Sequence, residues 1–276
     1  MSLFVVDEYL CVSCGDCVAD CPLGLIKLAD DEDFPVQIEN AEKLCINCGH
    51  CMSVCEPGAL SLVAMPREEC RVIDWDMAPS LEQMETIVQS RRSMRVYNEK
   101  KVPEKLIARI IDTARYAPTG SNRQMLDWLV ISGREKLDIL VRHVIDWAAD
   151  LVEKQQPLAE SLRVQRLIDA HNAGDDPILR NAPVLVLIHA PGKYAGAGGL
   201  VDATIALTTS ELVSFAAGLG TCWAGYFNIA AASWPPLQHA LALADGHVCC
   251  GAMMLGYPDV RYKLVPQRKE ARVTFR

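Results

Sequence analysis

Two tightly spaced runs of cysteine near the N-terminus constrain this chain more than any other feature. Each run has the spacing C-x-x-C-x-x-C-x-x-x-C, and the two superpose at an offset of 34 residues, together with Gly15 and Gly49. The chain therefore begins with an internal repeat whose two copies carry potential ligands at equivalent positions. These eight of the chain's twelve cysteines are Cys11, Cys14, Cys17, Cys21, Cys45, Cys48, Cys51 and Cys55.

The spacing within each run bears on which metal the thiolates bind. Soft thiolate ligands at this density suit iron–sulfur clusters or zinc. Structural zinc sites use cysteine pairs set apart by longer loops, and the two runs do not divide into such pairs. The spacing is that of 4Fe–4S ligation, in which three thiolates of a run bind one cluster and the fourth lies elsewhere. Two 4Fe–4S clusters are predicted, with zinc as the alternative.

Composition and compartment agree with a metal or redox role for the cysteines. No uncharged apolar run approaches the roughly 20 residues that a membrane helix needs, so no membrane association is expected. The first residues lack the basic segment and continuous apolar stretch of a secretory signal, which predicts a reducing cytoplasmic location. The other four cysteines, which have no ligand spacing, are expected to be small core residues. They are Cys70, Cys222, Cys249 and Cys250.

Charge separates the cysteine-rich region from the rest of the chain. Residues 1–70 contain 13 acidic and three basic residues, whereas residues 71–276 contain 22 acidic and 24 basic residues. Such an acidic surface favours a basic partner and disfavours nucleic acid. The predicted organisation is a cysteine-rich domain over 1–70, a linker over 71–84 and a larger domain over 85–276.

The larger domain opens with a cluster of arginines in the sequence RRSMR, residues 91–95. Guanidinium groups bind phosphate oxygens through paired hydrogen bonds, and a serine hydroxyl can complete such a site. Alone, the cluster is a weak signal and is better explained as an ordinary exposed basic patch. Apolar residues at helical spacing then predict a helix after Pro103, and VDATIALTTSELVSFAAG predicts a long, nearly uncharged buried helix.

Residues 1–65 resemble the bacterial ferredoxins that carry two 4Fe–4S clusters. The resemblance implies that the fourth cysteine of each run binds the cluster of the other run. One departure from the family pattern is Glu56, which separates Cys55 from Pro57, whereas Pro22 directly follows Cys21. One cluster would then be bound by Cys11, Cys14, Cys17 and Cys55, and the second by Cys45, Cys48, Cys51 and Cys21.

Residues 85–276 resemble the nitroreductase family of FMN enzymes. The resemblance is carried by RRSMR, APTGSNRQ, GLGTCWAGYF and GYPDV. It implies that Arg91, Arg92 and Ser93 contact the phosphate and ribityl chain of FMN. Arg95 would approach the pyrimidine edge of the flavin, where a cation stabilises negative charge on the reduced ring.

The same resemblance implies further flavin contacts and a homodimer. Asn122 would hydrogen-bond the flavin, and the backbone amides of Gly225 and Tyr226 would lie near flavin N5. Arg268 and Lys269 are the candidates for reaching the phosphate from the C-terminal segment. No catalytic side chain is predicted, and Met125 and Leu126 replace the Pro-Trp of many members, which leaves the substrate open.

Together these features predict an α+β protein, with a small ferredoxin-like domain preceding an α+β sandwich built on a mainly antiparallel sheet. The predicted function is a cytoplasmic, homodimeric iron–sulfur flavoprotein oxidoreductase. Ferredoxin or NAD(P)H would be the electron donor, and a nitroaromatic, quinone or similar conjugated molecule the acceptor. Two alternatives stay open: an electron-transfer module that serves a protein partner, and an enzyme acting on a flavin, halogenated or cofactor substrate.

Overall fold

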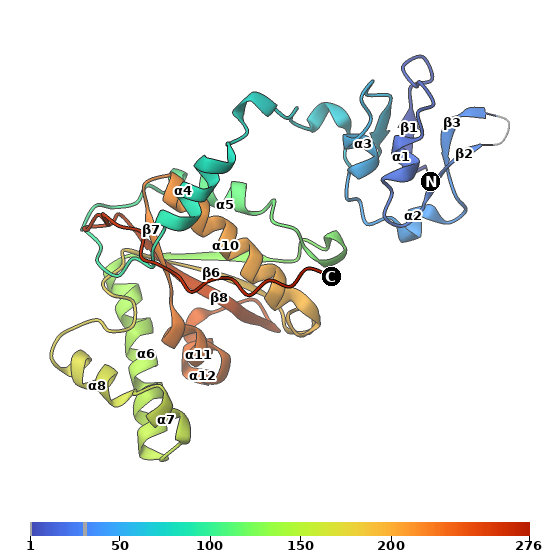
Figure 1. Cartoon of the computed structure of the whole chain (residues 1–276). Helices are drawn as coiled ribbons and strands as arrows, with labels where there is room; N and C mark the ends of the chain where they lie inside the picture. Colours follow the sequence, from blue (N-terminus) through green and yellow to red (C-terminus); the bar gives the residue numbers. More distant parts are fainter. Residues whose placement is uncertain (1, 30–31) are drawn as a thin grey trace. The chain divides into compact units, whose positions relative to one another are not determined.

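The computed structural model describes residues 2–29 and 32–276, and the chain divides into two compact units (Figure 1). The first unit comprises Met1–Ala78 with Ser121–Arg123, and the second comprises Pro79–Gly120 with Gln124–Arg276. Over the described part of the chain, no helix combines the length and the apolar composition needed to span a membrane.

The first unit contains short helices and two antiparallel strand pairs, β1 with β4 and β2 with β3. Its core is formed by apolar side chains from both copies of the repeat, including Phe4, Ile26 and Leu60. Its elements are β1 (Phe4–Val6), α1 (Asp16–Ala19), β2 (Ile26–Ala29), β3 (Glu32–Gln37), α2 (Ala41–Leu44), α3 (His50–Ser53) and β4 (Leu60–Leu62), followed by 3₁₀ turns at Arg67–Glu69 and Trp75–Met77.

The two copies of the repeat adopt the same local backbone. Gly15 precedes α1 with φ 79°, and Gly49 precedes α3 with φ 77°. Glycine adopts this left-handed conformation without the steric cost of a Cβ atom. The paired glycines therefore turn each cysteine run into a short helix in the same way.

The second unit is built on a four-stranded sheet with the order β5-β6-β8-β7, in which all neighbouring pairs are antiparallel. This confirms the predicted antiparallel sheet. Its elements are α4 (Leu81–Ser90), α5 (Glu104–Ala114), β5 (Asp127–Ser132), α6 (Arg134–Glu153), α7 (Pro157–Ser161), α8 (Gln165–Asn172), β6 (Val184–Pro191), α9 (Gly192–Tyr194), a π-helical turn (Ala195–Gly199), α10 (Leu200–Ala216), β7 (Gly220–Trp223), α11 (Gly225–Ser233), α12 (Pro235–Leu241) and β8 (His247–Gly256).

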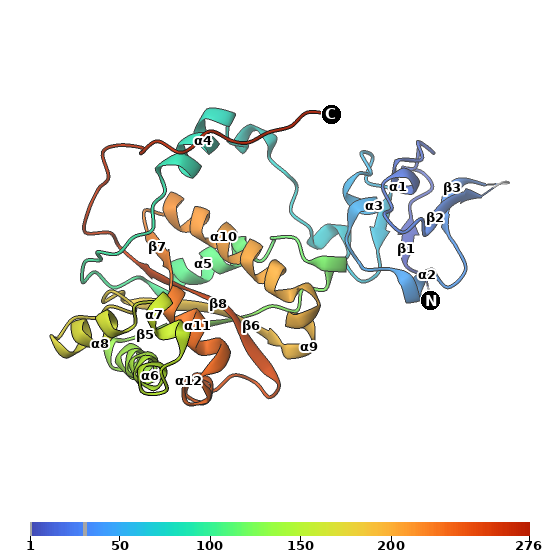
Figure 2. The same ribbon diagram turned by 60° about the horizontal axis from the view of Figure 1, so that its bottom comes forward.

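Helices cover both faces of this sheet (Figure 2). Leu185 and Leu187 of β6 pack in the cluster formed with α6 and α11, whereas Val184 and Val186 pack in the cluster formed with α5. Alternate residues of a strand point to opposite faces, so this continuous apolar run fills both cores. The predicted α+β sandwich is confirmed.

The four cysteines outside the two runs do not all occupy the core. Cys222 and Cys250 are buried, Cys249 is half-buried and Cys70 is exposed. The prediction was therefore wrong for Cys70. This residue ends the 3₁₀ turn at Arg67–Glu69, in a segment where no described residue between 69 and 80 is buried.

Candidate functional site

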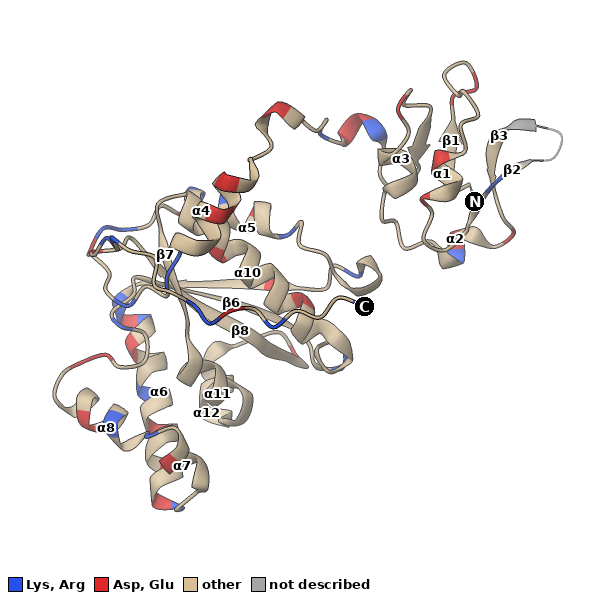
Figure 3. Cartoon of the chain, in the orientation of Figure 1, with Lys and Arg blue, Asp and Glu red and all other residues tan. Residues whose placement is uncertain are grey.

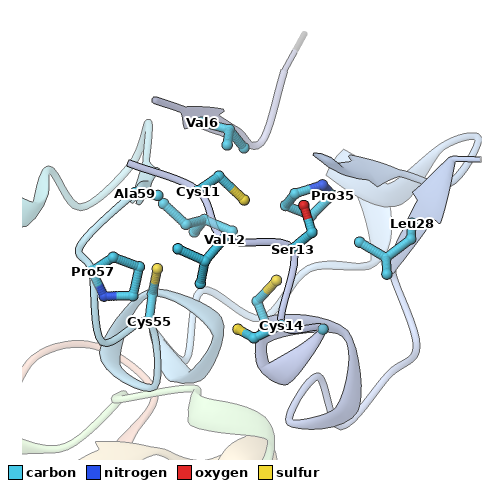
Figure 4. Close-up of a pocket in the computed structure, with 13 residues that line it drawn as sticks. Val6, Cys11, Val12, Ser13, Cys14, Leu28, Pro35, Cys55, Pro57 and Ala59 are labelled. Carbon is cyan, nitrogen blue, oxygen red and sulfur yellow. The ribbon is translucent and has the colours of Figure 1, made fainter. Parts of the chain in front are cut away.

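Four cysteines from both runs line one pocket of the first unit. Cys11, Cys14 and Cys17 of the first run share this pocket with Cys55 of the second run. Figure 4 shows Cys11, Cys14 and Cys55 around it, with Val6, Pro57 and Ala59 among the apolar residues of its wall. Burial raises the pKa of the Cys17 thiol, and Cys55 and Cys14 raise it further by charge repulsion.

A second pocket of the first unit brings together the other four cysteines of the runs. Cys21 of the first run lines it with Cys45, Cys48 and Cys51 of the second. Burial raises the pKa of the Cys51 thiol to about 11, and the other three cysteines add repulsion. A bound cation would reverse this effect, because a coordinating thiol loses its proton to the metal.

Backbone N–H groups point at sulfur atoms in the second pocket. The Leu25 N–H donates to Cys21 Sγ at 3.3 Å, and the Asn47 N–H donates to Cys45 Sγ at 3.4 Å. Hydrogen bonds of this kind tune the reduction potential of an iron–sulfur cluster. The residues of both pockets therefore suit 4Fe–4S clusters in ligand type and in ligand number, and the second pocket also offers backbone donors to its sulfur atoms.

In the second unit, residues 91–95 run beside strand β7. The Met94 N–H donates to the Thr221 carbonyl oxygen at 2.8 Å. A Cβ atom at Gly220 would lie 2.7 Å from Met94 Cβ, so only glycine permits this approach. Gly218, with φ 77°, ends the preceding helix α10. The two glycines thus have different roles, one as a helix end and one as a contact point for the arginine segment.

Replacing Gly220 with alanine is expected to destabilise the second unit by about 1–3 kcal/mol, because overpacking forces neighbouring atoms to move. Thermal unfolding of the apoprotein measures this effect. Gly196→Ala is the matched control, since a Cβ atom there would meet nothing within 4 Å. Equal melting temperatures for the two variants would contradict the close packing of Met94 on β7.

Arg91 is held by a buried carboxylate that the sequence analysis did not identify. Its guanidinium lies 3.1 Å from Glu211 Oε1, and Glu211, on α10, is only 5% exposed. The Thr221 hydroxyl also donates to Glu211 Oε1, at 3.3 Å. Glu211 therefore anchors the start of the arginine segment to α10. The available signal was an acidic residue within a predicted helix that is nearly uncharged.

A pocket of the second unit brings together three of the predicted flavin contacts. Arg95, Gly225 and Tyr226 line it, together with Cys222 and Trp223 of β7. Its volume of about 330 Å³ lies within the range of small-molecule sites. Burial raises the pKa of the Cys222 thiol, while Arg95 and the Ser93 side chain, both close to it, act in the opposite direction.

The remaining predicted contacts do not line this pocket. Arg92 is half-buried beside Arg91. Arg268 and Lys269 are exposed in the C-terminal segment, which has no regular secondary structure and is rich in basic residues (Figure 3). Asn122 is grouped with the first unit, where its side-chain amide donates to the carbonyl oxygens of Ile46 and Asn47 at 2.9 and 3.0 Å.

Asp202 is a second buried carboxyl group that the sequence analysis did not identify. It lies near the start of α10 and is 6% exposed. The Gly120 N–H donates to its two oxygens at 3.2 and 3.1 Å, and the Tyr194 hydroxyl donates to Oδ2. Asp202 therefore fixes the glycine of the APTGSNRQ motif to the sheet-covering helix α10.

Comparison with known proteins finds a family match for each part of the chain. Residues 88–257 match the nitroreductase family, and residues 10–60 match the 4Fe-4S dicluster domain. The nitroreductase match covers more than half of the chain, which therefore belongs to the nitroreductase family. The chain is 25% identical over 214 residues to the 4-nitrobenzoate reductase of Nocardioides sp. (strain LMS-CY), covering 67% of this chain and 85% of that protein.

Solved structures agree on the fold of the second unit. A nitroreductase with bound FMN from Bacteroides fragilis NCTC 9343 has a TM-score of 0.55 and 20% identity, and one from Desulfitobacterium hafniense DCB-2 has a TM-score of 0.55 and 21% identity. Each comparison covers 68% of this chain and 97% of the other. The chain thus combines a nitroreductase fold with a 4Fe–4S dicluster segment, as predicted.

Proposed function

We propose that this protein is an iron–sulfur flavoprotein oxidoreductase that passes electrons between two 4Fe–4S clusters and FMN. The observation that carries the proposal is the grouping of the eight cysteines, in which each pocket receives its fourth cysteine from the opposite run. A 4Fe–4S cluster takes four thiolates and exchanges single electrons. Each pocket offers such a set.

The proposed ligands follow the two pockets. Cys11, Cys14, Cys17 and Cys55 would bind one cluster, and Cys21, Cys45, Cys48 and Cys51 the other. Apolar residues around both groups limit contact with water, a second factor that sets the potential of a cluster. Neither run supplies a complete site, so the two copies of the repeat would have to fold together.

The proposed FMN site is built from the arginine segment and the loop after β7. Bound FMN supplies hydride or single-electron chemistry. Arg91, Arg92 and Ser93 would hold the phosphate and ribityl chain, and Arg95 would place positive charge at the pyrimidine edge. The amides of Gly225 and Tyr226 would lie near N5, with Asn122, Arg268 and Lys269 as further contacts. The shared pocket of Arg95, Gly225 and Tyr226 supports this assignment.

The proposed acceptor is a nitroaromatic, quinone or similar conjugated molecule. The relative named 4-nitrobenzoate reductase supports a nitroaromatic. We propose a cytoplasmic homodimer, with ferredoxin or NAD(P)H as the donor. The acidic excess of residues 1–70 favours a donor protein with a basic docking surface. The chain's own contribution would be to position the flavin and to stabilise charge on it.

Rapid mixing under anaerobic conditions tests the entry of electrons through the clusters. Reduced ferredoxin is mixed with the FMN-loaded protein, and flavin reduction is followed by absorbance. In the variant Cys14→Ala, Cys48→Ala, which removes one ligand from each proposed cluster, the rate is expected to fall at least about 100-fold, equivalent to about 2.7 kcal/mol in the barrier.

The FMN content of this variant and its reduction by dithionite serve as controls, because both should be unchanged. Flavin reduction at the wild-type rate by ferredoxin or by NAD(P)H in the variant would contradict entry through the clusters. Turnover of nitroaromatics and quinones by the reduced wild-type protein is measured separately. A reduced flavin that no small acceptor reoxidises would instead support the electron-transfer module.

A further inference from the structure

Three potential metal ligands lie together in the second unit, at one end of the central sheet. Asp127 begins β5, His189 lies near the end of β6 and His247 begins β8. Asp127 and His189 are direct partners in the antiparallel ladder of β5 and β6. His189 pairs on its other side with Cys249, two residues after His247, and the register shifts between Ile188 and His189. The irregular ladder thus brings residues from three strands to one place.

The ligand atoms of these residues are close enough to share one ion. Nδ1 of His189 lies 2.9 Å from Nδ1 of His247, and the latter lies 3.5 Å from Asp127 Oδ2. One potential ligand atom from each of the three side chains lies within 4.8 Å of the others. In a tetrahedral zinc site with bonds of about 2.0–2.1 Å, neighbouring ligand atoms are separated by about 3.3 Å. Both measured distances lie within about 0.4 Å of that value.

We propose that Asp127, His189 and His247 bind a divalent transition-metal ion, with zinc as the ion to which the site is assigned. Two imidazoles and one carboxylate form a ligand set that zinc uses, with water in the fourth position. Imidazole nitrogen suits zinc and other late first-row metals, whereas the hard ions magnesium and calcium prefer oxygen. The site shares no residue with the two cysteine pockets or with the pocket of Arg95.

The exposure of the three side chains suits ion entry and retention. The side chain of Asp127 is 60% exposed and that of His247 is 15% exposed. The carboxylate therefore provides an approach from solvent, while the imidazoles lie deeper. A metal here would connect β5 to β8, which are not neighbours in the sheet because β6 lies between them. The ion would hold three strand ends together where the ladder is irregular.

A hydrogen bond between the two imidazoles is the competing explanation for their short separation. In a neutral pair, one Nδ1 donates and the other accepts, and no ion is needed. This explanation predicts that added zinc neither binds at this cluster nor changes the stability of the second unit. The metal site predicts both effects, because an ion that binds only the folded state raises the melting temperature.

The experiment uses the holoprotein, isolated anaerobically, treated with a mild chelator and titrated with Zn²⁺. One zinc ion per protomer is expected by elemental analysis. X-ray absorption at the zinc edge should show only nitrogen and oxygen neighbours, at the distance of about 2.0–2.1 Å that is typical of bonds from zinc to histidine and carboxylate. Zinc misplaced in a cysteine pocket would instead show sulfur at about 2.3 Å.

The variant His189→Ala, His247→Ala should lose this zinc and the rise in melting temperature that accompanies it. His171→Ala removes a histidine of α8 outside the cluster and should behave as wild type. Asp127→Asn changes an exposed side chain at constant size, so this variant keeps the test available if the double variant unfolds. The Asp127→Asn protein should bind zinc at least about 10-fold more weakly than wild type. Wild-type protein without nitrogen-bound zinc, zinc retained in the variant His189→Ala, His247→Ala, or wild-type zinc affinity in Asp127→Asn would each overturn the proposal.

Discussion

The double variant Cys14→Ala, Cys55→Ala is expected to keep one 4Fe–4S cluster, with about four iron atoms per protomer, whereas Cys14→Ala, Cys21→Ala is expected to keep none. The first pair belongs to a single pocket, so its loss damages only one site. Cys21 lies in the other pocket, so the second pair damages both sites. Each variant removes two cysteines, and Cys14 is removed in both, so the two variants form a matched comparison.

Iron and sulfide analysis of anaerobically reconstituted protein measures this difference, and the EPR spectrum of the reduced protein reports the remaining cluster. The reciprocal variant Cys48→Ala, Cys21→Ala should also keep about four iron atoms. If each run instead served its own cluster, Cys14→Ala, Cys21→Ala would keep half of the iron and Cys14→Ala, Cys55→Ala would lose it all. That reversed pattern would contradict the crossed assignment.

The first unit was predictable because the residues that define it lie close together in the sequence. The cysteine spacing and the matching Gly15 and Gly49 lie within short windows, and each glycine produces the same turn in the structure. Strands β6 and β8 of the second unit were predictable for a similar reason, since each contains a buried apolar run, at residues 184–188 and 250–256. Cys70 shows the limit of composition, because cysteine is often buried but nothing in this segment covers it.

The supporting residues of the candidate sites were not predictable because their partners are distant in sequence. Glu211 meets Arg91 only once α10 packs beside the arginine segment, and 120 residues separate them. His189 and His247 come together through a β-ladder whose register shifts at His189. Periodicity identifies such helices and strands but does not give their register, so pairs of this kind require the structure.

Replacing Arg91 with alanine is expected to destabilise the second unit of the apoprotein by about 3 kcal/mol. The change leaves the Glu211 carboxylate buried without its ion-pair partner, and breaking such a pair from one side typically costs about 3–5 kcal/mol. The lower end of this range applies because the Arg91 side chain is 26% exposed, so water can partly replace the lost guanidinium beside Glu211. For a unit of this size the melting temperature should fall by about 6–12 °C.

Glu211→Gln in the Arg91→Ala background separates the ion pair from the loss of packing. The glutamine carries no charge and can still accept the hydrogen bond from the Thr221 hydroxyl, so the double variant should regain about half of the lost stability. Arg92→Ala is the control, since it removes the same charge from the neighbouring position, and Arg92 makes no ion pair with a described residue. It should leave the apoprotein's melting temperature nearly unchanged and weaken only FMN binding. Equal losses of stability in Arg91→Ala and Arg92→Ala would show that Glu211 does not anchor the segment.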